Sequence, residues 1–296
     1  KSLPPQVKLL VQAALVGLAV TAIPDNWFQF RILPEIFGDQ GSLIAAKIIL
    51  ALIWLWFINL YNFMDGSDGI TAIETMSIGL AWFLYIVFLP LGDWLQNIIY
   101  GANSNNPTPF WLAHFSFKFY DEITQKLIYA VFLGLSLAAA SLAFLKFNWH
   151  PAKIFLGDVG SIPLGFLLGF VLLIMFGMGL WPLAVILPLY YWADSGVTLV
   201  RRMLKGEKFW LPHRSHFYQR AILAGAGHNG VAKHVLKTNL GLMVVGAPTA
   251  YIADPIVQII CVALAIIWVA WRMRDMIEKL PYRQTKPDPT ATAEKH

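Results

Sequence analysis

Three short polar segments interrupt a chain that is otherwise almost continuously apolar, and they carry the residues that could do chemistry. The first reads Asn-Phe-Met-Asp-Gly-Ser-Asp-Gly at 62–69, the second Gly-Asp-Val-Gly-Ser at 157–161 and the third His-Arg-Ser-His at 213–216. Carboxylates suit Mg²⁺ or a general base, whereas arginine and histidine donate to phosphate oxygens. These residue types predict a site that handles a metal and phosphate groups.

The first segment holds two carboxylates three residues apart, Asp65 and Asp68, each followed by a glycine. A helical turn would place both carboxylates on one side, and the glycines would allow close backbone approach. Asn59 and Asn62 precede them at the end of a predicted helix and join the candidate site. The alternative is a polar turn between two spans. A calcium loop is excluded, because its twelfth position, counted from Asp65, is Met76.

The second segment places Asp158 between two glycines, just ahead of an apolar helix. Free backbone N–H groups and the helix dipole at such a position could meet a phosphate while the carboxylate holds a metal. The alternative is that Asp158 or Ser161 only caps the helix.

The third segment gathers His213, Arg214 and His216 in a loop. Arginine offers a planar fork for phosphate oxygens, and histidine can donate to them or move protons; the alternative is a basic loop that touches anionic lipid. Asp194 lies inside a predicted span, where an acid is a functional candidate by default. Pairing of Asp194 with a neighbouring helix is the other interpretation.

These residues must be positioned by membrane-spanning helices. Of the 296 residues 57% are hydrophobic and only 13% are charged, and the mean hydropathy is +0.59, so the composition predicts an integral membrane protein. The apolar runs lack the alternation of barrel strands, which favours an all-α, polytopic bundle of about eight transmembrane helices. The predicted spans cover 7–23, 43–61, 71–91, 127–147, 161–180, 182–200, 236–253 and 255–271.

The distribution of Lys and Arg predicts the orientation of this bundle. A cytoplasmic N-terminus places most of the 22 basic residues in cytoplasmic loops, and it brings all three polar segments to that face. The net charge of +5 then needs no nucleic acid to explain it. The Gly-x-Gly-x-x-Gly pattern at 225–230 is interpreted as a turn, because no predicted strand precedes it. Residues 1–280 are predicted to form a single transmembrane domain, and 281–296 a polar, disordered tail.

The three segments together resemble the polyprenyl-phosphate N-acetylhexosamine-1-phosphate transferases, glycosyltransferase family 4, over residues 1–275. Within this family, the sequences of the three segments are most similar to those of enzymes that initiate O-antigen or related surface polysaccharides. The resemblance implies a donor, UDP-N-acetylhexosamine, an acceptor, polyprenyl (undecaprenyl) phosphate, and release of UMP. It also implies Mg²⁺, with Mn²⁺ as an alternative, and an active site on the cytoplasmic face of a bacterial inner membrane.

The resemblance also implies roles for individual residues. Asp158 would bind Mg²⁺; Asn62, Asp65 and Asp68 would line the nucleotide and metal site. His213, Arg214 and His216 would grip the diphosphate or the sugar, and Asn59 and Asp194 complete the substrate-binding candidates.

One departure from the family concerns the start of the chain. The family carries two adjacent aspartates at a cytoplasmic helix end, and this chain begins a residue or two after that position. We therefore expect an N-terminally truncated chain that cannot complete catalysis alone. A transporter and an inactive scaffold subunit are the competing functions, and a homodimer is one option for the oligomeric state.

Overall fold

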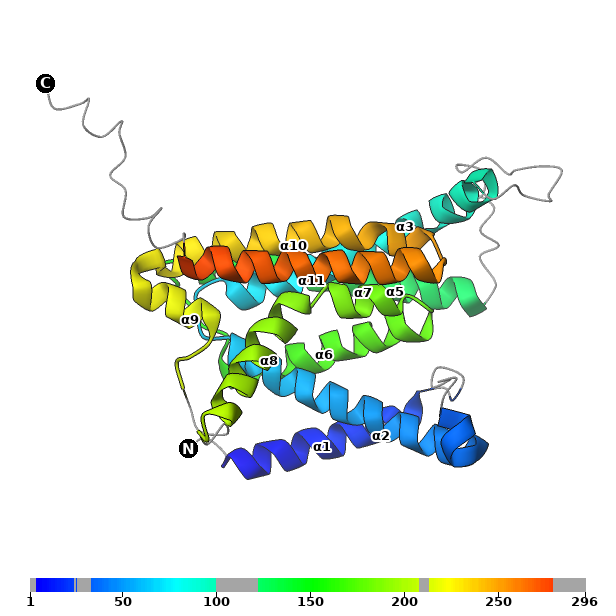
Figure 1. Ribbon diagram of the computed structural model, residues 1–296, viewed down its shortest axis with the longest axis horizontal. Coiled ribbons are helices and arrows are strands. Elements are labelled where there is room, and N and C mark those ends of the chain that lie inside the picture. The colour runs from blue at the N-terminus through cyan, green and yellow to red at the C-terminus, as the bar shows by residue number, and fades with distance from the viewer. Residues whose placement is uncertain (1–3, 24, 26–32, 100–121, 208–212, 279–296) are drawn as a thin grey trace, which may run out of the picture. The chain divides into compact units, whose positions relative to one another are not determined.

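The computed structural model describes residues 4–23, 25, 33–99, 122–207 and 213–278. The described residues form helices and no strand (Figure 1), and five of the helices are long and apolar enough to cross a membrane. These five spans are Gln40–Met64, Ile70–Phe88, Val131–Asn148, Gly157–Gly177 and Pro255–Glu278. The predicted all-α, polytopic membrane fold is confirmed. The predicted tail at 281–296 lies outside the described residues.

The helices carry the labels of Figure 1. They are α1 Pro5–Ala22, α2 Leu33–Met64, α3 Ile70–Ile99, α5 Glu122–Asn148, α6 Gly157–Gly177, α7 Trp181–Ile186, α8 Leu189–Leu204, α9 Phe217–Ala221, the π-helix η2 Ile222–Ala226, α10 Gly227–Tyr251 and α11 Pro255–Glu278. Contacts divide them into two compact units, each described by itself below. The first comprises Lys1–Asp65 and Leu156–Val185, and the second Gly66–Phe155 and Ile186–His296.

In the first unit, α1 and α6 both pack against α2. Trp54 of α2 is buried against α6, with its ring stacked 4.6 Å from Phe166 and its indole N–H donating to the Phe166 carbonyl at 3.0 Å. Gly165 and Gly169, one turn apart on α6, are the positions where α2 comes closest: a Cβ at Gly169 would lie 2.3 Å from the Trp54 ring. Small residues at this spacing let membrane helices approach closely.

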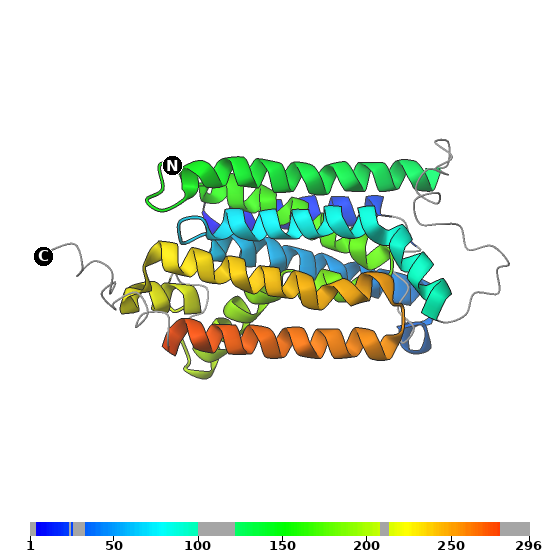
Figure 2. The ribbon, with the colours of Figure 1, turned by 90° about the horizontal axis from the view of Figure 1, so that it is seen from above.

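In the second unit, α5, α3, α10 and α11 lie next to one another in that order, as Figure 2 shows. Gly79 of α3 faces Gly134 of α5, and a Cβ on either would come within 3 Å of the other's carbonyl oxygen. Between α3 and α10, the fully buried Glu74 accepts a hydrogen bond from the Asn239 amide at 2.7 Å. Polar side chains of these helices thus face other helices.

Three predicted spans differ from the five apolar spans of the described residues. Segment 182–200 is broken between α7 and α8 at Leu187 and Pro188. Proline has no N–H for the helical ladder, and its ring clashes with the preceding turn. Residues 236–251 of segment 236–253 belong to α10, which begins earlier, at Gly227, ends at Tyr251 and is not among the five apolar spans. Segment 7–23 forms the shorter apolar helix Gln6–Ala22.

Candidate functional site

In the first unit, the end of α2 and the beginning of α6 bring predicted site residues together. The Ser161 hydroxyl donates to the Asn62 side-chain oxygen at 2.6 Å and to the Gly157 carbonyl at 3.0 Å. Asn59, one turn earlier on α2, donates to the Gln12 side chain of α1 at 3.0 Å. Buried and half-buried polar contacts therefore link α1, α2 and α6 within an otherwise apolar unit.

Asp158 lies in the first turn of α6, with about half of its side chain exposed. Neither Asp158 nor Ser161 caps the helix, since no side-chain hydrogen bond caps its N-terminus. The Asp158 carboxylate instead forms an ion pair with Lys8 of α1. A carboxylate and an ammonium group beside a helix N-terminus can hold a metal and a phosphate together.

Lys8 is a residue that sequence reasoning missed as a site candidate. In the sequence, Lys8 counts only among the basic residues that predict the orientation of the helix bundle in the membrane. Its side chain is 28% exposed, so it can exchange its carboxylate partner for a ligand. The available signal was its place four residues after Pro4, on the first turn of an apolar helix.

The expected helical turn carrying both Asp65 and Asp68 is wrong. Helix α2 ends at Met64 and α3 begins at Ile70, and the residues between them are not helical. Gly69 has a φ of +76°, a left-handed conformation that glycine adopts without strain, which ends the turn before α3. Asp65 belongs to the first unit and Asp68 to the second.

In the second unit, Asp68 lies against two histidines that sequence reasoning did not select. His150 Nδ1 lies 2.7 Å from Asp68 Oδ2, and His228 Nδ1 lies 3.8 Å from Asp68 Oδ1. The two imidazole rings stack at 5.2 Å between centroids, and the Ala152 N–H also donates to Asp68 at 3.2 Å. Two loops and the first turn of α10, far apart in sequence, thus meet at this carboxylate.

Asp68, His150 and His228 each offer one ligand atom, and these three atoms lie within 4.8 Å of one another. Among the described residues, this is the group of three or more His, Cys, Asp or Glu side chains that could hold a metal ion. Two imidazoles and one carboxylate suit a metal that accepts nitrogen ligands, such as Mn²⁺ or Zn²⁺, better than Mg²⁺, which prefers oxygen. Asp158 offers Mg²⁺ a single carboxylate, a number that suffices where substrate phosphates supply further oxygens.

The glycine pattern at 225–230 has a structural role here. Gly225 and Gly227 both have positive φ, at +102° and +65°: Gly225 kinks the chain within η2, and Gly227 is the first residue of α10. This break starts α10 at the turn that bears His228. No strand precedes it in the described chain, as expected.

Asp194 of α8 is fully buried and organises the third predicted segment. Its carboxylate accepts hydrogen bonds from five groups: the Phe217 N–H at 2.9 Å, His216 Nδ1 at 3.0 Å, the Tyr218 N–H and Tyr190 hydroxyl, each at 3.2 Å, and the Thr198 hydroxyl at 3.4 Å. The buried carboxylate therefore fixes the first turn of α9 and the His216 ring. Its geometry is that of a positioning residue, and the predicted substrate contact of Asp194 stays a prediction.

The remaining residues of the third segment are open to a ligand. Arg214 is exposed, and the His213 ring, half-buried, stacks on His216 at 4.9 Å between centroids. His213 Nδ1 lies 2.9 Å from the Ser215 hydroxyl. Partial burial, followed by the positive charges of His216 and Arg202 nearby, lowers the pKa of His213 below 6.5. A neutral imidazole beside an arginine can donate to an anionic ligand or accept a proton from it.

Comparisons with known proteins agree with these observations. The family model described as "Glycosyl transferase family 4" matches residues 1–176, which include Asn59, Asn62, Asp65, Asp68 and Asp158. A Bacillus subtilis (strain 168) protein named "Probable undecaprenyl-phosphate N-acetylglucosaminyl 1-phosphate transferase" is 31% identical over 228 residues, or 75% of this chain and 53% of that protein.

Two further relatives carry related names. The "Decaprenyl-phosphate N-acetylglucosaminephosphotransferase" of Mycobacterium tuberculosis (strain CDC 1551 / Oshkosh) is 25% identical over 242 residues, 74% of this chain and 52% of the relative. The "Phospho-N-acetylmuramoyl-pentapeptide-transferase" of Bacillus pumilus (strain SAFR-032) is 26% identical over 174 residues, 54% and 49% of the two chains. The chain spans about half the length of the curated relatives that it matches. With more than half of its residues matched by the family model, the chain belongs to glycosyl transferase family 4.

Proposed function

We propose that the protein transfers an N-acetylhexosamine 1-phosphate from its UDP-linked form to a polyprenyl phosphate. A phosphate oxygen of the lipid attacks the β-phosphorus of the UDP-sugar. The bond from that phosphorus to the bridging oxygen breaks, and UMP leaves with the bridging oxygen. The product is a sugar linked to the lipid through a diphosphate, the first intermediate of a lipid-linked glycan such as O-antigen or a cell-wall polymer.

The observation that carries this proposal is the pairing of Asp158 with Lys8 at the N-terminus of α6. Two anionic substrates repel each other, so their reaction needs positive charge at the phosphates. Asp158 and the substrate diphosphate would hold Mg²⁺, which supplies that charge when it is bound. Lys8, released from Asp158, would bind a phosphate oxygen as a compact ammonium donor.

The remaining residues bind and orient the substrates in this proposal. Arg214 and His213 donate to the diphosphate or to the sugar, and His216 is held by Asp194 so that the loop keeps one shape. Asn62, Asp65 and Asp68 contact the nucleotide and its metal. We place this chemistry at the cytoplasmic face of a bacterial inner membrane, because Lys and Arg are concentrated in the loops on that side.

The proposal is tested by UMP release from membranes that express the complete reading frame. Each of several UDP-N-acetylhexosamines is supplied with or without polyprenyl phosphate and Mg²⁺, which also identifies the preferred sugar. Asp158→Asn should lower the rate by about 100-fold or more. The matched control is Asp254→Asn, since Asp254 also begins a helix, and asparagine keeps the cap that it provides to α11. UMP release that needs neither lipid nor metal, or a normal rate in Asp158→Asn, would refute the assignment.

A further inference from the structure

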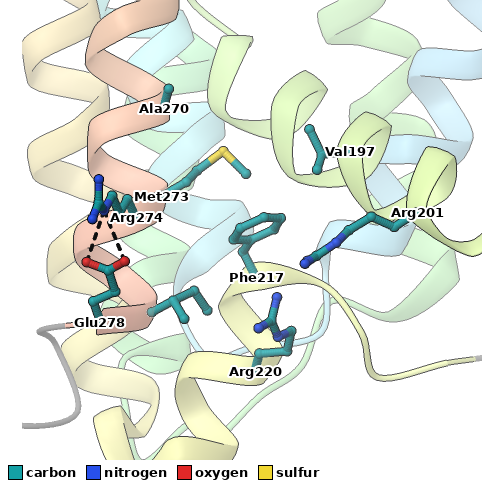
Figure 3. A pocket seen from close by; sticks show the side chains of 9 residues that line it. Val197, Arg201, Phe217, Arg220, Ala270, Met273, Arg274 and Glu278 are labelled. Carbon is teal, nitrogen blue, oxygen red and sulfur yellow. Dashed lines mark hydrogen bonds and ion pairs between the residues drawn. The ribbon is translucent and has the colours of Figure 1, made fainter.

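A cavity of about 390 Å³ in the second unit lies outside the residues proposed for transfer. It opens between α8, α9 and α11, and three arginines line it together with apolar side chains (Figure 3). The arginines are Arg201, Arg220 and Arg274. Glu278 also lines the cavity and pairs with Arg274, so the cavity combines a net positive rim with an apolar wall.

Two of these arginines share one aromatic ring. The guanidinium carbons of Arg201 and Arg220 lie 5.7 and 5.6 Å from the centre of the Phe217 ring, and Figure 3 shows both side chains reaching toward it. Stacking on an aromatic face fixes the direction of a guanidinium group without using its hydrogen-bond donors. Both arginines thus keep their N–H groups available to a ligand.

The charges of the two arginines are not neutralised within the described part of the chain. Arg274 is held by Glu278 at 3.0 Å, and Arg202 by Glu207 at 3.2 Å. No ion pair of this kind joins Arg201 or Arg220 to a carboxylate among the described residues. Two cations that lie beside one ring without an acidic partner repel each other, and an anion that binds both would offset that repulsion.

The cavity lies where lipid headgroups are found. Helix α11 has 24 residues and is a membrane span, so it is about 36 Å long, slightly longer than the roughly 30 Å hydrocarbon core. Arg274 and Glu278 are on its last two turns, at the membrane–water boundary. Val197, Ala270, Met273 and Ile277 form the apolar wall. A free phosphate would make no favourable contact with this apolar wall, whereas the glycerol and upper acyl chain of a lipid would cover it.

We propose that this cavity binds an anionic phospholipid, with the headgroup phosphate between Arg201 and Arg220 and the glycerol against α11. The site is separate from the transfer chemistry and does not depend on it. Polyprenyl phosphate shares the phosphate chemistry, so the experiment must distinguish the two lipids.

The test measures phosphatidylglycerol bound to the detergent-purified protein, expressed from its complete reading frame, by native mass spectrometry. The double variant Arg201→Gln/Arg220→Gln should weaken binding by about 25-fold, since each basic residue near a lipid surface contributes roughly fivefold. Glu278→Gln frees Arg274 and should strengthen binding about two- to fivefold. Lys233→Gln removes an exposed charge on α10, outside the cavity, and should leave binding unchanged.

Three results would overturn the proposal. Phosphatidylcholine, or inorganic phosphate at the same concentration, could bind as well as phosphatidylglycerol. An equimolar amount of polyprenyl phosphate could displace phosphatidylglycerol, which would assign the cavity to the substrate lipid. If the double glutamine variant does not elute as a single folded species, Arg201→Lys/Arg220→Lys replaces it. That variant keeps both charges and should retain phosphatidylglycerol within about fivefold of the unmodified protein. Loss of preference for phosphatidylglycerol in the lysine variant would also count against a charge-based site.

Discussion

Replacing Asp194 by asparagine should destabilise the protein far more than its nearly unchanged volume suggests. Asp194 is fully buried and accepts hydrogen bonds from the backbone N–H groups of Phe217 and Tyr218, one at each carboxylate oxygen. Asparagine offers one oxygen, so one of these N–H groups must face an NH₂ donor. The hydroxyls of Tyr190 and Thr198 can rotate to accept, but a backbone N–H cannot.

The magnitude follows from this geometry. A hydrogen bond to a charged group contributes about 1.5–3 kcal/mol, and a buried donor left without a partner costs about 1–3 kcal/mol. Because one bond is lost and the others weaken with the charge, we expect Asp194→Asn to lower the free energy of unfolding by about 2–4 kcal/mol. The control is Glu207→Gln, the same chemical change at a carboxylate that is 42% exposed and paired with Arg202. It should cost less than about 1 kcal/mol.

Two assays separate a local role from a global one. Unfolding in detergent micelles gives the stability of each variant, and limited trypsin digestion reports on the loop that Asp194 holds. Cleavage after Arg214 and Arg220 should increase in Asp194→Asn before the rest of the chain opens, because the first turn of α9 has lost an anchor. Equal stabilities of Asp194→Asn and Glu207→Gln, with unchanged digestion, would refute the positioning role.

Three further tests, two of them with a control variant, address the packing and the electrostatics. Gly169→Ala should cost about 1–3 kcal/mol of stability, measured by unfolding in micelles, because its Cβ meets buried Trp54; Gly17→Ala, with nothing within 4 Å of its Cβ, should stabilise by about 0.5–1 kcal/mol. Arg272→Met removes the cation 3.5 Å from buried Asp275, which keeps His234 at 3.9 Å, and should cost about 3–5 kcal/mol in the same assay. Arg274→Met, at an exposed position, should cost under about 1 kcal/mol. The pKa of His213 in the folded protein lies below its unfolded value of 6.5. The stability that His213 contributes is therefore complete above pH 6.5 and is lost as the pH falls through the folded pKa. When unfolding is measured from pH 7.5 to 5, the free energy of unfolding should fall less in His213→Asn than in the unmodified protein.

The membrane fold could be predicted because it depends on local composition. Long apolar runs with few charges fix helices such as α6 and α11 without any knowledge of their neighbours. The break at Pro188 was missed because the apolar content of 182–200 outweighed one proline, although α8 also carries Asp194 and Arg201. The sequence predicts the start of α10 nine residues too late, because the polar residues of its first turns resemble those of a loop. His234 and Asn239 are in fact buried against α11 and α3.

The site could be predicted only in part, for a similar reason. Asp158 and Asn62 stand out in the sequence as polar residues at the ends of apolar helices, and the structure links their helices through Ser161. His150 and His228 were missed because 78 residues separate them, and only the tertiary fold brings both to Asp68. For Asp194 the sequence left two interpretations open, since the partners that link it to the third segment lie 22 to 24 residues later in the chain.

The central claim, transfer of a sugar together with its phosphate, is tested most directly by following the β-phosphate. Membranes that express the complete reading frame receive UDP-N-acetylhexosamine labelled with ³²P in the β-phosphate, polyprenyl phosphate and Mg²⁺. The account predicts that the label moves into the organic-soluble lipid while unlabelled UMP is released, and that Asp158→Asn stops both. Recovery of the label in water-soluble UDP, with unlabelled sugar on the lipid, would show transfer of the sugar alone and would contradict the account.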